Sequence, residues 1–131
     1  MSKIALMIAP GCEEIEALTV TDIIRRAKID LDMISVTDSK TITGSHNITF
    51  ETDALIAGTD FKEYDAIVLP GGLPGTTNLG EHPTVIRTIK EFAANGKTVA
   101  AICAAPSVLG VNGILQGKKA TCHPRWEEKL I

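Results

Sequence analysis

The chain has 131 residues, a formal net charge of -3 and three cysteines. This length predicts a single domain with a real hydrophobic core, and the charge gives no reason to expect a nucleic acid or an anionic membrane as partner. An odd number of cysteines without CxxC spacing speaks against a disulfide framework and a zinc ribbon. We see neither a signal-peptide pattern nor an apolar run near the roughly 20 residues of a membrane span, so we expect a cytoplasmic protein.

The N-terminal half alternates buried apolar runs with one amphipathic stretch. Continuous apolar runs bounded by turn residues predict central parallel strands, and apolar side chains at near-helical spacing predict a helix. The expected elements are a strand over 3–9, a helix over 12–28, a strand over 31–36 and a small hairpin over 41–50 that lies off the main sheet. Residues 53–60 predict a connection with little regular structure.

The C-terminal half continues the alternation. The expected elements are a strand over 64–70, a helix over 83–95, a strand over 98–102, the first turn of a helix over 107–110, a short fifth strand over 119–122 and the start of a helix over 125–131. The fold class that follows is α/β, a three-layer sandwich around a mostly parallel sheet in one domain over 1–131. A final helix of seven residues is too short to cover a sheet face. We therefore expect the domain's last strand and helix to be absent from this chain, either removed or carried on a separate fragment.

Four loops leave the carboxyl ends of the expected strands, and ligands bind beyond those ends in parallel sheets. The loops cover 10–16, 71–75, 103–106 and 122–124. They are therefore expected to converge in space although they lie far apart in the sequence.

Cys103 stands where a strand of small residues turns into a helix. Such a corner is a nucleophile elbow, which pushes its central residue out of the sheet. The positive end of the helix would favour the thiolate over the thiol. The alternative is that Cys103 is a small buried core residue, as free cysteines often are.

Two glycines follow the strand over 64–70 directly. Because Gly71 and Gly72 have no side chains, their backbone N–H groups can approach a substrate closely, and with the Ala104 N–H they could form an oxyanion hole. The alternative is an ordinary turn. The segment is not a dinucleotide fingerprint, since it lacks both the spacing and the immediate helix.

Three carboxylates and a histidine complete the set of candidate groups. Glu13, Glu14 and Glu16 could serve the thiol, or could be solvated acids that favour a helix N-terminus. His123 could equally be a surface turn residue. Cys12, Cys122 and His123 lack the spacing of metal ligands, so no metal and no cofactor is expected. We interpret Cys12 and Cys122 as packing residues, with Cys12 exposed enough to oxidise.

Four motifs in sequence order resemble the ThiJ/PfpI superfamily, and most closely its DJ-one-like (Parkinson-disease-associated deglycase) branch. They are Gly-Cys-Glu-Glu-Ile-Glu at 11–16, Val-Leu-Pro-Gly-Gly at 68–72, Ala-Ala-Ile-Cys-Ala-Ala-Pro at 100–106 and Thr-Cys-His-Pro at 121–124. The resemblance spans the whole chain. It implies a flavodoxin-like fold, a homodimer and a nucleophilic, oxidation-sensitive cysteine.

The resemblance also assigns roles to single residues. It places the nucleophile on Cys103, the carboxylate that hydrogen-bonds it on Glu16, the nearby histidine on His123, and the backbone donors on Gly72 and Ala104. Asp22 matches an acid that lies near that histidine in the family. Two departures stand out: members of the family are longer by a strand and one or more helices, and His46 occupies the position of an arginine that reaches the pocket from the partner subunit.

Three hypotheses follow from these residues. The first is a cofactor-independent glyoxalase or deglycase that acts on methylglyoxal or its early glycation adducts, with Glu16 as the proton shuttle. The second is an oxidative-stress sensor or chaperone in which Cys103 is oxidised without turnover. The third is an intracellular cysteine peptidase similar to the PfpI branch of the same superfamily, in which a histidine follows the elbow cysteine directly and serves as base. It is disfavoured because Ala104 occupies that place here.

Overall fold

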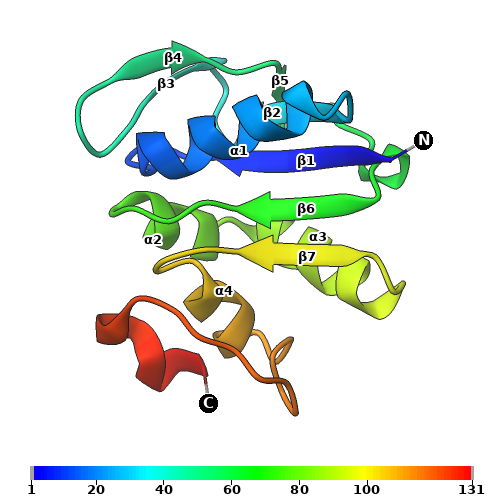
Figure 1. Cartoon of the computed structure of the whole chain (residues 1–131), viewed down its shortest axis with the longest axis vertical. Coiled ribbons are helices and arrows are strands. Elements are labelled where there is room, and N and C mark those ends of the chain that lie inside the picture. Colours follow the sequence, from blue (N-terminus) through cyan, green and yellow to red (C-terminus); the bar gives the residue numbers. More distant parts are fainter. Residues whose placement is uncertain (1, 131) are drawn as a thin grey trace.

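The computed structural model describes residues 2–130, which form a five-stranded parallel sheet with helices on both faces (Figure 1). The strand order is β5-β2-β1-β6-β7, so β1 lies at the centre. The strands are β1 (Lys3–Ile8), β2 (Asp30–Ser35), β5 (Ala54–Leu55), β6 (Ala66–Leu69) and β7 (Thr98–Ala101). A separate antiparallel hairpin consists of β3 (Thr41–Thr43) and β4 (Thr49–Glu51).

Four α-helices cover the sheet, and two 3-10 helices lie at its margins. The α-helices are α1 (Glu14–Arg26), α2 (Gly75–Gly80), α3 (Pro83–Ala94) and α4 (Pro106–Val111), and the 3-10 helices are η1 (Phe61–Glu63) and η2 (Pro124–Leu130). None of the helices that the structure describes is long and apolar enough to cross a membrane.

The two faces of the sheet carry separate apolar clusters, because successive side chains of a strand point to opposite faces. From β1, Ala5 and Met7 pack with side chains of α2, α3 and α4. Leu6 and Ile8 pack on the other face with Ala17 of α1. Figure 1 shows α1 on the near side of the sheet and α3 on the far side. The central strand is therefore buried on both sides, as its continuous apolar run predicts.

Most of the predicted elements are confirmed, including the α/β class, the four long strands and the hairpin. The helices predicted over 12–28 and 83–95 are α1 and α3, which the structure places at 14–26 and 83–94. The predicted strand over 119–122 is wrong. Residues 117–121 are exposed and pair with no strand among the described residues, so β7 is an edge of the sheet. The segment 53–60 contains the short edge strand β5, where little regular structure was expected. The predicted helix start near 125 is a 3-10 helix, and Ile131 lies outside the described residues.

Buried Glu14 fastens the β3–β4 hairpin to the first turn of α1. Its side chain is 3% exposed, and its carboxylate accepts hydrogen bonds from the backbone N–H groups of His46, at 2.8 Å, and Ile48, at 3.1 Å. A Cβ atom on Gly44 would collide with this carboxylate. Burial raises the pKa of Glu14, but backbone N–H groups, including those of Ile48 and His46, and the His46 side chain together lower it to about 2.

We predict that Glu14→Gln lowers the free energy of unfolding by about 2 kcal/mol at pH 7, because an amide replaces a carboxylate that accepts charge-assisted hydrogen bonds. Since the folded-state pKa lies below the ordinary value of 4.5, this stability is present above about pH 4.5 and is lost as the pH falls towards 2. Urea unfolding at pH 7 and pH 2.5 measures the difference. The exposed residue Glu128 offers a control, since Glu128→Gln should change little. An equal difference between wild type and Glu14→Gln at both pH values would contradict the prediction.

Candidate functional site

The chain order of the sheet reverses beside β1, and this reversal defines the place where a ligand can bind. After β1 the chain forms β2 on one side and later returns to form β6 on the other. The crevice beyond the carboxyl ends of two such strands is the usual ligand site of open α/β sheets. Figure 1 shows β1, β6 and β7 pointing to the same edge, so their following loops meet there.

The loops after β1 and β6 are joined by backbone hydrogen bonds. The Glu13 N–H donates to the Gly71 carbonyl at 2.9 Å, and the Gly75 N–H donates to the Gly11 carbonyl at 3.1 Å. A Cβ atom on Gly72 would collide with the Glu13 nitrogen. The absence of side chains at these glycines therefore allows the two loops to meet. The convergence of the loops was expected from their places at the carboxyl ends of the strands, whereas Gly71 and Gly72 were expected to approach a substrate.

Cys103 lies directly beyond β7 in a left-handed backbone conformation, with φ of +62°. This conformation costs a non-glycine residue roughly 1–2 kcal/mol. Among the described residues, Lys28 and Asn47 also have a positive φ, but they lie in turns after a helix and within the hairpin. Cys103 is only half-buried. A strained, partly accessible cysteine at the end of a strand is the geometry of a nucleophile elbow.

Glu16 and Cys103 meet at Gly71. The Gly71 N–H donates to the Glu16 carboxylate at 2.8 Å. A Cβ atom on Gly71 would lie 2.6 Å from Glu16 Oε1 and 2.7 Å from Cys103 Cβ, which is too close for either. The expectation that the Gly71 N–H serves an oxyanion needs correction, because that N–H already holds Glu16. Gly71 positions the carboxylate instead.

The balance of interactions at Cys103 favours the thiol. Burial raises the pKa of Cys103, and the charge and hydrogen bond of Glu16 raise it further, while the Ala104 N–H opposes them. The sequence predicts the opposite, that the helix end favours the thiolate. The reason is local: α4 begins only at Pro106, three residues beyond the cysteine, and lacks a side-chain cap. The carboxylate contact outweighs the backbone donor.

The backbone N–H groups of Gly72 and Ala104 donate to no backbone acceptor among the described residues. Gly72 has φ of +91°, a conformation that glycine adopts without strain. The Ala104 N–H is near enough to the Cys103 sulfur to stabilise its charge. These are the groups that sequence and resemblance nominate for an oxyanion.

His123 is joined to Cys103 through the backbone. Its N–H donates to the Cys103 carbonyl at 2.7 Å, while its ring Nδ1 lies 3.3 Å from the Arg125 nitrogen. Within residues 2–130, the ring makes no hydrogen bond or ion pair with Cys103 or Glu16. Asp22 likewise pairs with Arg26 at 3.1 Å and not with the histidine.

The remaining candidates have structural roles. Glu13 caps α1 by accepting from the Ile15 N–H at 2.9 Å, which agrees with the alternative of an acid that favours a helix N-terminus. Glu14 is buried and is not a solvated acid. Cys12 packs in the core at 1% exposure, which corrects the expectation that it can oxidise, and burial and Glu14 raise its pKa to about 11. Cys122 is half-buried and lies outside both apolar clusters.

Two carboxylates and one imidazole form a cluster whose oxygen and nitrogen atoms are of the kinds that bind metal ions. Ligand atoms of Glu13, Glu14 and His46 lie within 4.8 Å of one another. The hydrogen bonds that Glu14 accepts from the hairpin account for this arrangement without an ion. It is also a different group from the cysteine-histidine set considered from sequence.

Comparison with known proteins gives one consistent relationship. The model of the DJ-1/PfpI family matches residues 2–131. The chain is 36% identical over 132 residues to Protein dj-1beta of Drosophila melanogaster, with 100% of this chain and 71% of that protein covered. It is 34% identical to a protein of Thermococcus kodakarensis named Deglycase TK1284, covering 91% of this chain and 70% of the relative. A solved structure described as Toxoplasma gondii DJ-1, oxidized, superposes with a TM-score of 0.94 at 35% identity, covering 98% of this chain and 71% of that one.

We predict that Glu16→Gln lowers the pKa of Cys103, because it removes the negative charge that disfavours the thiolate. The rate of Cys103 alkylation by iodoacetamide, followed by peptide mass spectrometry across a pH series, measures this pKa. The alkylation midpoint of the variant should move to lower pH. Glu13→Gln is the matched control, because Glu13 raises the same pKa less. An unchanged or higher midpoint in Glu16→Gln would refute the role of this carboxylate.

Proposed function

Because the chain belongs to the DJ-1/PfpI family, we propose that it is a cofactor-independent glyoxalase or deglycase acting on methylglyoxal or its early glycation adducts. The observation that carries the proposal is the meeting of Glu16 and Cys103 at Gly71. A nucleophile beside an acid–base group is what addition to an aldehyde and subsequent proton transfer require. A relative that is named a deglycase gives further support.

The proposed reaction uses two residues in sequence. The Cys103 sulfur forms a bond to the aldehyde carbon of methylglyoxal, and its proton passes through Glu16 to the aldehyde oxygen, which gives a hemithioacetal. Glu16 then removes the proton from that carbon and returns it to the neighbouring carbonyl carbon. The hydroxyl proton of the hemithioacetal passes to the oxygen of that neighbouring carbon, so that a thioester of lactate forms. Water hydrolyses the thioester, which releases lactate and restores the thiol. The net change is the addition of one water molecule, with no external oxidant or reductant.

The backbone N–H groups of Gly72 and Ala104 support the proposed reaction. Both N–H groups lack backbone acceptors among the described residues, and the Ala104 N–H interacts with the Cys103 sulfur, while Gly72 follows the Gly71 that packs against Cys103. We assign both to the oxyanion that forms when sulfur adds to the carbonyl. His123 contributes through its backbone, which holds the Cys103 carbonyl. A direct catalytic role for its ring stays a prediction.

A second candidate function is oxidation of Cys103 itself. Support comes from the accessible, strained cysteine and from the relative whose solved structure is described as oxidized. A peptidase is not proposed, since Ala104 supplies no base. The homodimer, a separate C-terminal fragment and the cytoplasmic location stay predictions.

We predict that Cys103→Ser lowers the rate of methylglyoxal consumption at least about 100-fold, because a serine hydroxyl is a far weaker nucleophile than a thiol. Proton NMR measures the loss of methylglyoxal and the appearance of lactate. Cys122→Ser is the matched control and should keep the wild-type rate. Consumption by Cys103→Ser at the wild-type rate would rule out the proposed function.

Mild peroxide treatment separates the second candidate from the first. We predict that Cys103 gains two oxygen atoms, as a sulfinate, while the buried Cys12 stays reduced. Peptide mass spectrometry assigns the oxygen to each cysteine. The sensor role would be excluded if Cys103 stayed reduced while Cys122 was oxidised.

A further inference from the structure

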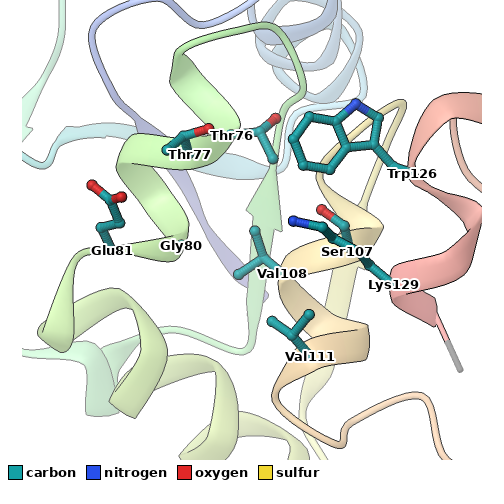
Figure 2. Close-up of a pocket in the computed structure, with 9 residues that line it drawn as sticks. All are labelled: Thr76, Thr77, Gly80, Glu81, Ser107, Val108, Val111, Trp126 and Lys129. Atoms are coloured by element: carbon teal, nitrogen blue, oxygen red, sulfur yellow. The ribbon is translucent and has the colours of Figure 1, made fainter.

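A cavity of about 230 Å³ lies between α2, α4 and η2 (Figure 2). Cys103 and Glu16 are not among the residues that line it. This volume is well above the roughly 10–15 Å³ that a cavity needs to hold one water molecule. The cavity is therefore large enough for a small molecule.

The wall of this cavity contains a buried hydroxyl group without a partner. Thr76 is 2% exposed, and its Oγ1 is the one buried side-chain nitrogen or oxygen that lacks a hydrogen bond among the described residues. Figure 2 shows this hydroxyl directed towards the side of the cavity where Trp126 lies. Buried polar atoms are nearly always paired, so an orphan in a cavity wall points to a missing partner.

The groups around Thr76 indicate which chemical groups a ligand in this cavity would carry. The Ser107 hydroxyl already donates to the Ala104 carbonyl at 2.6 Å, so it can only accept from a ligand. Lys129 Nζ lies 4.8 Å from the centre of the Trp126 ring and extends into the same space (Figure 2). An ammonium group binds a carboxylate, whereas the threonine and serine oxygens can accept from a hydroxyl. Glu81 lies at the opposite side of the cavity and disfavours a second negative charge.

We propose that this cavity is a binding site for a small monoanionic hydroxycarboxylate of the size and chemistry of lactate. The carboxylate contacts Lys129, and the hydroxyl group contacts Thr76 and Ser107. The proposal rests on the cavity alone and does not depend on the reaction proposed for Cys103. Binding can therefore fail while turnover succeeds, or the reverse.

Trp126 makes the site directly observable because it is the only tryptophan in the sequence. Titration of the full chain with lactate should give a saturable change in tryptophan fluorescence. Acetate, which lacks the hydroxyl, and glycerol, which lacks the carboxylate, should bind at least about fivefold more weakly. Isothermal titration calorimetry with the same three compounds detects binding that leaves the fluorescence unchanged.

Two variants test the assignment to this cavity. Thr76→Val and Lys129→Met should each weaken lactate binding at least about fivefold, since each removes one polar contact. Thr88→Val is the matched control: Thr88 is buried too, but its hydroxyl donates to the Thr84 carbonyl at 2.7 Å, outside the cavity. Thr76→Val should also keep or raise the unfolding temperature, because it removes an unpaired hydroxyl, while Thr88→Val should lower it. Absence of saturable binding by both methods, equal affinity for glycerol, or unchanged affinity in Thr76→Val would overturn the proposal.

Discussion

The contact between Gly71 and Glu16 is the constraint on which the arrangement of the site depends. The Gly71 N–H holds the Glu16 carboxylate, its carbonyl accepts from the Glu13 N–H, and its missing side chain leaves room for Cys103. One residue thus joins the loops that follow β1, β6 and β7. A methyl group at this position would have to displace either the carboxylate or the cysteine, so both the backbone hydrogen bonds and the small volume are required.

The same contact sets the chemistry of the thiol. A helix end beside a cysteine normally lowers its pKa, yet here burial and Glu16 raise the pKa of Cys103 and only the Ala104 N–H opposes them. Two groups that share one proton cannot both be negative at low cost. The pair is therefore suited to passing a proton between sulfur, carboxylate and substrate, in contrast to a Cys-His pair, in which the imidazolium favours the thiolate.

The spacing of apolar residues predicted those strands and helices that bury an apolar face against the rest of the protein. The strands β1, β2, β6 and β7 and the helices α1 and α3 were predicted because apolar residues recur along them. The short elements α2 and β5 carry too few apolar positions for any period to be visible. Residues 119–122 have strand-like composition, but a strand also needs a neighbour, and β7 offers its edge to none of the described residues.

The site was predicted in part. Topology alone brings Cys103, the glycines and the first helix to one edge of the sheet, whereas only the resemblance singled out Glu16 among three glutamates. Helical geometry explains the choice after the fact. Glu14 and Glu16 differ by about 200° around the helix axis, so Glu14 faces the hairpin and Glu16 faces the loop after β6. The sequence could not show that the hairpin would donate hydrogen bonds to Glu14, because this contact depends on packing between segments about 30 residues apart.

The elbow and the second cavity are adjacent through Ala104. Its N–H faces the Cys103 sulfur, and its carbonyl accepts from Ser107, which lines the cavity. A ligand hydroxyl that donates to Ser107 therefore contacts the side chain that holds the carbonyl of the residue with the oxyanion donor. The short α4 is the structural reason for this proximity. The helix begins three residues after the cysteine. Residues 103–107 therefore contain both the reacting sulfur and Ser107, which lines the cavity.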